Sequence, residues 1–114
     1  YFHTLFSDDD GNTEIALIND SLELGAALRF NVRELPCLTE WKMLSEGEYV
    51  LGLEPGNTNP IGRLEAQKRG TIEYLAPGQK KEVSIELVIL DGAEEIAAEE
   101  NKINTLSGRK AYAV

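Results

Sequence analysis

The sequence predicts an all-β fold, an antiparallel β-sandwich, from three observations. Apolar and polar residues alternate with a period of two over long segments, which gives a strand one apolar and one polar face. Turn-forming residues, mainly Gly, Asn, Asp and Pro, separate these segments. No helical pattern of ten or more residues interrupts them before residue 93, which argues against a parallel α/β sheet.

The clearest strand is expected at residues 22–32. Its buried face would consist of Leu22, Leu24, Ala26, Leu28, Phe30 and Val32. Residues 83–90 alternate in the same way and end in consecutive apolar residues, so this strand is expected to end buried on both faces. The apolar row Tyr49, Leu51 and Leu53 predicts a strand with Glu54 on its reverse face. Shorter strands are expected at residues 2–6, 14–18, 38–44 and 71–75.

Two parts of the chain are expected. Residues 1–92 are predicted to form the β-sandwich portion of a larger domain. Residues 93–114 are acidic, and only residues 93–103 carry a thin apolar stripe of helical spacing. A short peripheral helix and a flexible tail are both consistent with this stretch.

The charge balance excludes some classes of partner. The chain has 114 residues and a formal net charge of −9, and a net anionic chain repels phosphate backbones, so no nucleic-acid partner is expected. No apolar run approaches the ~20 residues that span a bilayer, so no membrane partner is expected either. A single cysteine without a secretory signal favours a cytoplasmic location. The first residue is Tyr1, so a fragment or a processed form is expected, in which the active site is only partly present.

No metal or cofactor site is predicted. The only cysteine is Cys37 and the only histidine is His3, which provide no ligand pair at metal spacing. The segment Asp8–Gly11 is not interpreted as an EF-hand calcium loop. The first and twelfth loop positions, which require acidic ligands, would be Phe6 and Leu17. Cys37 lacks a neighbouring base in the sequence and is expected to be a small buried hydrophobe.

The segment after residue 54 has the composition of a polyol site. Glu54 ends a predicted strand and opens a loop that carries the amides Asn57 and Asn59 and the guanidinium of Arg63. Trp41 belongs to the expected neighbouring strand. Carboxylates and amides hydrogen-bond to sugar hydroxyls, and an indole packs against sugar C–H bonds. The alternative is structural, with Glu54 paired to Arg63 and Trp41 in the core.

The same segment resembles the C-terminal part of galactose-mutarotase-like (aldose 1-epimerase-like) proteins, and most closely an uncharacterised bacterial branch. The resemblance rests on WKM at residues 41–43, YVLGLEP at 49–55 within the more specific run GLEPGN at 52–57, the Gly62–Arg63 pair, and LAPG at 75–78 in an expected last hairpin. It covers residues 1–90. It implies that the chain is the last third of a β-supersandwich.

The resemblance also implies a chemistry. Glu54 matches the glutamate that acts as general base on the anomeric hydroxyl, while a histidine acid, upstream of this chain, protonates the ring oxygen. Trp41, Lys42, Asn57, Asn59 and Arg63 would shape the substrate site. His3 is either a strand residue of the sheet or a binding residue that lines the cleft.

Three hypotheses therefore remain from the sequence. The protein is an aldose epimerase or mutarotase, a non-catalytic sugar-binding or sensing module, or a structural sheet without a ligand. The expected partners are a carbohydrate and, through exposed strand edges, the rest of its own chain or a second copy. The fragment by itself is not expected to be active.

Overall fold

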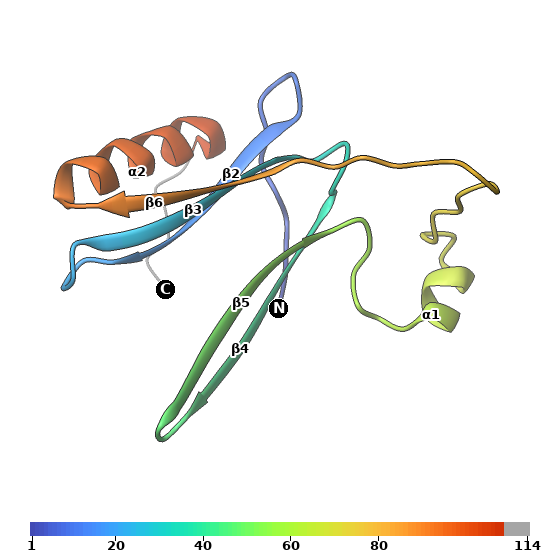
Figure 1. The fold of residues 1–114 in the computed structure, drawn as a ribbon, viewed down its shortest axis with the longest axis horizontal. Coiled ribbons are helices and arrows are strands. Elements are labelled where there is room, and N and C mark those ends of the chain that lie inside the picture. Colours follow the sequence, from blue (N-terminus) through green and yellow to red (C-terminus); the bar gives the residue numbers. More distant parts are fainter. Residues whose placement is uncertain (109–114) are drawn as a thin grey trace. The chain divides into compact units, whose positions relative to one another are not determined.

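The computed structural model describes residues 1–108, which form two compact units (Figure 1). The first unit contains residues 1–5 and 33–83, and the second contains residues 6–32 together with the described residues from 84 onward. Each unit has one three-stranded sheet in which all neighbouring strands are antiparallel. The predicted all-β, antiparallel class with a short C-terminal helix is confirmed.

The second unit consists of a sheet and one helix. Its strands β2 (Asn12–Asn19), β3 (Leu24–Asn31) and β6 (Ile85–Asp91) pair in the order β2-β3-β6. The helix α2 (Ala93–Ser107) follows β6 directly and contacts all three strands. Gly92 makes the reversal between them with a φ of 98°, a conformation that favours glycine. The rest of the predicted tail, residues 109–114, lies outside the described residues, and the predicted division at residue 92 stays a prediction.

The core of the second unit lies on the face of β3 that was expected to be polar. Ala27 is completely buried and packs with Leu90 and Ile96, at 3% and 5% exposure. Gly25 belongs to the same face, where an added Cβ would lie 3.0 Å from the carbonyl oxygen of Leu17. The small side chain of Ala27 lets Ile96 of α2 pack against the sheet.

The opposite, apolar face of this sheet was expected to be buried. Phe30 is buried there, but Leu24 is 46% exposed, and on β6 Leu87 and Ile89 are 64% and 60% exposed. The expectation that β6 ends buried on both faces is therefore wrong. A period of two shows that two faces differ, but it does not show which face a distant helix covers.

A buried ionic cluster fastens α2 to the sheet. Arg29 Nε lies 2.9 Å from Glu14, and its two terminal nitrogens lie 3.2 Å from Glu86 and 2.8 Å from Glu99. Lys102 adds a contact of 3.1 Å to Glu99, which is only 1% exposed. Three carboxylates thus share two cations, and Glu99 Oε1 is buried without a hydrogen-bond donor.

The half-buried Glu14 and the buried Glu99 of this cluster have pKa values displaced in opposite directions. Burial, and then Glu99, raises the pKa of Glu14. Burial acts in the same direction on Glu99, but Arg29 and Lys102 outweigh it and hold the pKa of Glu99 below its ordinary value. A protonated Glu14 can donate to Glu99, which supplies the donor that Oε1 lacks.

We expect the cluster to stabilise the fold most near the ordinary glutamate pKa of 4.5. The contribution of Glu14, whose folded pKa is raised, is lost as the pH rises through that pKa. The contribution of Glu99, whose folded pKa is lowered, is lost as the pH falls through it. Urea midpoints measured against pH should therefore decline less steeply above pH 4.5 in Glu14→Gln than in the wild type. Parallel curves for the two proteins would contradict this assignment.

The first unit is built around a long hairpin. Strands β1 (Phe2–His3), β4 (Cys37–Ser45) and β5 (Glu48–Gly56) pair in the order β1-β4-β5. The β4–β5 register runs from Cys37 opposite Gly56 to Ser45 opposite Glu48. Gly47, with a φ of 81°, makes the tight connection that the sequence predicted (Figure 1).

Three sequence expectations fail in the first unit. Strand β1 ends at His3 rather than at residue 6. Residues 71–75 were expected to be a strand but have no strand partner in the described chain, so the last hairpin is absent and β6 pairs with β3 instead. A short helix, α1 (Arg63–Lys68), was not predicted, because six residues are too few to establish a helical period. The one feature of the sequence that indicates this helix is the pair of opposite charges at Glu65 and Arg69, four residues apart, which form an ion pair of 2.8 Å.

Candidate functional site

The β4–β5 hairpin places Glu54 and Trp41 on the same face. Directly opposed residues in an antiparallel pair project to the same side, and the register sets Thr39 opposite Glu54 and Trp41 opposite Gly52. Glu54 therefore points away from Leu53, as the alternation in the sequence predicted. Both Glu54 and Trp41 are solvent-exposed, Trp41 by 49%.

Gly52 makes room for the Glu54 carboxylate. A Cβ at position 52 would lie 3.1 Å from Glu54 Oε1, so the carboxylate folds back over the space that the glycine leaves. Trp41 lies across the strands from that space. An exposed carboxylate beside an exposed indole can hydrogen-bond to a polyol and pack against its C–H face.

His3 and Lys42 lie on the opposite face of this sheet. His3 pairs with Leu38 across β1 and β4, and its Nε2 lies 2.9 Å from Glu40 Oε2. Lys42 Nζ lies 3.2 Å from Glu40 Oε1 and 4.5 Å from the ring centroid of Tyr1. The structure therefore groups these two predicted binding residues around Glu40 and does not bring them to Glu54 and Trp41.

Glu40, which contacts two of the predicted binding residues, was missed by the sequence analysis. It is only 7% exposed, and the ammonium of Lys42, followed by His3, keeps its pKa below the ordinary range against the effect of burial. The signal was present in the sequence, because positions 40 and 42 of a strand share a face and carry opposite charges. A carboxylate held this way orients the imidazole of His3, whose side chain is 42% exposed.

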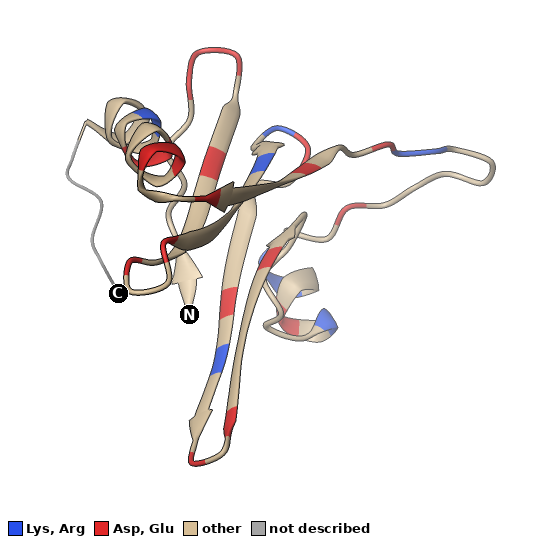
Figure 2. Cartoon of the chain, turned by 60° about the vertical axis from the view of Figure 1, so that its left-hand side comes forward, with Lys and Arg blue, Asp and Glu red and all other residues tan. Residues whose placement is uncertain are grey.

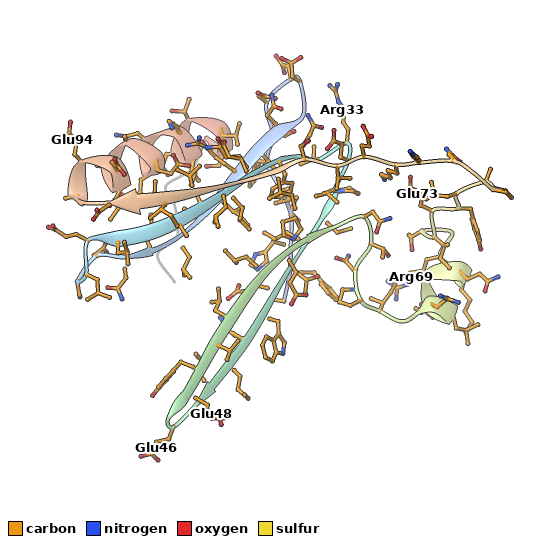
Figure 3. All side chains as sticks on the ribbon, viewed as in Figure 1. Arg33, Glu46, Glu48, Arg69, Glu73 and Glu94 are labelled. Carbon is orange, nitrogen blue, oxygen red and sulfur yellow. The ribbon has the colours of Figure 1, made fainter. Side chains whose placement is uncertain are left out.

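The loop after β5 forms a cavity of about 320 Å³, lined among others by Asn57, Asn59, Arg63 and Glu73. Three of the predicted site residues are therefore brought together. Asn57 Nδ2 donates to Glu73 Oε2 at 3.1 Å, and Lys81 Nζ lies 2.6 Å from the same oxygen. Lys81, and then Asn57, lowers the pKa of Glu73. Figure 3 shows Glu73 on the extended segment that follows α1.

A second cavity, of about 330 Å³, shares the wall formed by residues 57–59 and also contains Phe2, Arg69 and Cys37. Cys37 is half-buried and unpaired.

Nothing in the sequence indicated that Glu73 lines the first cavity, because residues 71–75 were expected to form a strand. The alternative pairing of Glu54 with Arg63 is not observed, since neither side chain makes an ion pair with a described residue.

The described residues offer no group of three or more His, Cys, Asp or Glu side chains arranged to hold a metal ion. Within residues 1–108, no helix is both long and apolar enough to cross a bilayer.

The chain belongs to the family described as Domain of unknown function (DUF4432), whose model matches residues 1–89. Among solved structures it is similar to a putative aldose 1-epimerase from Klebsiella pneumoniae, with a TM-score of 0.84 and 29% sequence identity. That similarity covers 95% of this chain and confirms the predicted fold class, an antiparallel sandwich fold similar to that of the Klebsiella protein. The chain spans 29% of the length of the Klebsiella protein. A search of curated proteins gave no match.

Proposed function

We propose that this chain is the C-terminal, carbohydrate-binding part of an aldose 1-epimerase-like protein, and that Glu54 is its general base. The observation that carries the proposal is the similarity to the Klebsiella protein, which extends over 95% of this chain at a TM-score of 0.84. The local geometry is consistent with it, because Glu54 is an exposed carboxylate at a strand end, beside the gap at Gly52 and across from Trp41.

In this mechanism Glu54 takes the proton from the anomeric hydroxyl of an aldose. An acid outside this chain protonates the ring oxygen, the C1–O5 bond breaks, and rotation about C1–C2 precedes ring closure. A carboxylate accepts the proton efficiently only if it lies within hydrogen-bond reach of the hydroxyl, which the open face of β5 allows. Asn57 and Asn59, on the loop that follows, would bind further hydroxyls.

A non-catalytic sugar-binding module is the second candidate. It is consistent with the geometry, because an exposed carboxylate beside an exposed indole is sufficient to bind a polyol, and His3, the one imidazole of the chain, lies on the face opposite Glu54. Within the described residues, Glu54 therefore has no imidazole acid beside it. Under this alternative, aldoses bind and change the fluorescence of Trp41, the only tryptophan, without exchange of their anomers.

The test is the substitution Glu54→Gln in the intact protein, with anomer exchange measured by NMR across a panel of aldoses. The amide keeps the shape and one hydrogen-bonding oxygen but cannot take a proton, so the exchange rate should fall ~10²-fold while affinity changes far less. The matched control is Glu48→Gln, on the same strand and the same face but beside the hairpin turn.

The outcomes separate the candidates. Equal exchange rates in the wild type and Glu54→Gln would exclude Glu54 as the base. Sugar binding without exchange in the wild type would establish the binding module. A comparable loss in Glu48→Gln would show that charge on this face, rather than a specific base, supports the rate.

We further propose that the apolar face of the β2-β3-β6 sheet is covered in the intact, cytoplasmic protein by the rest of its own chain. Leu87 and Ile89 are more than half exposed on this face, which is unusual for neighbouring large apolar residues. The isolated 114-residue chain should therefore self-associate, and sedimentation should show species larger than a monomer. A stable monomer over a wide concentration range would refute this.

A further inference from the structure

The charge of this chain is unevenly distributed, and a basic segment contributes Arg63 to the lining of the Asn57–Arg63 cavity. Residues 61–81 contain five of the 11 basic residues but only two of the 20 acidic residues, a local net charge of +3 in a chain of −9. Figure 2 shows Lys and Arg positions, in blue, on α1 and on the extended segment that follows it. Such a reversal of sign favours a negatively charged ligand.

Arg63 is the uncompensated charge of the cavity. Its guanidinium makes no ion pair or hydrogen bond with the described residues, and it lines the cavity together with Asn57 and Asn59. The carboxylate of Glu73 lines the same cavity, but Lys81 at 2.6 Å and Asn57 at 3.1 Å already satisfy it. The cavity therefore presents one free positive group beside a neutralised pair.

The backbone fixes the position of Arg63. Gly62, with a φ of 90°, turns the chain directly before Arg63, and the carbonyl oxygen of Gly62 accepts the hydrogen bond from Ala66 N at 3.0 Å. Arg63 is thus the first residue of α1, and the hydrogen bond between Ala66 and Gly62 restrains the backbone turn that contains it. A guanidinium fork on such a base can bind a carboxylate or a phosphate through two parallel hydrogen bonds.

We propose that the aldose bound by this protein carries an anionic group, a phosphate or a carboxylate, and that Arg63 binds this group. The inference rests on the proposed function, because the loop that supplies Asn57, Asn59 and Arg63 begins three residues after Glu54. Glu54 would then act on the anomeric end of the sugar while Arg63 selects its charged substituent. Arg63 is thereby a residue that determines specificity, and the amides of Asn57 and Asn59 bind the hydroxyls.

The experiment is calorimetric titration of the intact protein with matched ligands in the gluco and galacto series. These are the neutral hexose, its 6-phosphate and its uronate, together with inorganic phosphate. The wild type should bind one of the anionic sugars at least about tenfold more tightly than the neutral hexose, and the preferred anion identifies the group as phosphate or carboxylate. The preference should weaken as the salt concentration rises.

Arg63→Gln should abolish this preference, so that this variant binds the anionic sugars no more tightly than it binds the neutral hexose. Lys68→Gln is the matched control, because Lys68 ends the same helix, has no ion pair with a described residue and lines neither cavity. It removes the same charge and should retain the preference. Equal affinities for neutral and anionic sugars, or a preference that survives in Arg63→Gln, would overturn the inference.

Failure of the proposed function gives a different result. Anomer exchange on the neutral hexose without any anionic preference would remove the role of Arg63 and leave the role of Glu54 intact. Binding of inorganic phosphate that is lost in Arg63→Gln, without binding of any sugar, would retain the anion site and refute the sugar. Absence of binding by both sugars and phosphate would overturn both proposals.

Discussion

Replacing Arg29 with methionine is expected to destabilise the protein by about 3 kcal/mol or more, since it leaves a buried carboxylate without its principal cation. Arg29 Nη2 lies 2.8 Å from Glu99, whose side chain is 2% exposed, and Arg29 also contacts Glu14 and Glu86. Methionine fills a similar volume, so the loss is chiefly electrostatic. Urea unfolding followed by far-UV circular dichroism measures the change.

Two further variants make this result specific. Lys102→Met removes the other cation that contacts Glu99, but the Lys102 side chain is 55% exposed, so the expected cost is below about 1 kcal/mol. Arg29→Met combined with Glu99→Gln removes the isolated charge and should recover part of the lost stability. A double variant that is less stable than Arg29→Met alone would show that Glu99 stabilises the fold independently of Arg29.

An aspartate at position 27 is expected to have an effect of similar size, about 3 kcal/mol or more, or to prevent folding. Ala27 is completely buried between the sheet and Ile96 of α2, and a carboxylate there would have neither solvent nor room. Leu28→Asp is the comparison, because Leu28 follows Ala27 in the chain but lies on the opposite face of the sheet and is only half-buried. Loss of the α2 contribution to the circular dichroism in Ala27→Asp would locate the damage.

The relative size of these two effects tests the structure against the sequence pattern. Alternation alone assigns Leu28 to the buried face and Ala27 to the polar face. The position of α2 reverses the expected order of the two losses of stability, because α2 buries the face that carries Ala27. In the isolated chain, a larger loss in Leu28→Asp than in Ala27→Asp would mean that a second copy covers the apolar face more completely than α2 covers the face of Ala27.

The candidate site was partly accessible from the sequence. The alternation of β5 predicted that Glu54 and Leu53 point to opposite faces. The composition of the loop after residue 56 indicated that Asn57, Asn59 and Arg63 belong to one site, and these residues line one cavity. These are relations between residues close in the chain. Glu73, which lines the same cavity, could not be found this way, because its contact with Asn57 depends on how residues 57 and 73 are folded together.

His3 illustrates the same limit. The sequence predicted that His3 is a strand residue of the sheet or a residue lining the cleft, and only the register of β1 with β4 decided that it contacts Glu40 rather than the face of Glu54. Pairing between residues 37 positions apart is set by the whole sheet and not by either segment.

By itself, the sequence located most strands to within a few residues, and it determined that the protein is antiparallel and which face of β5 carries the carboxylate. Hydrophobic period, turn residues and charge are local properties that survive without a partner. The tertiary structure decided which sheet face α2 covers, that residues 71–75 join neither sheet, and that Arg29 contacts three carboxylates from three other elements. Burial and ion pairing depend on what lies opposite a residue in space, and an alternating pattern leaves both faces of a strand open to either outcome.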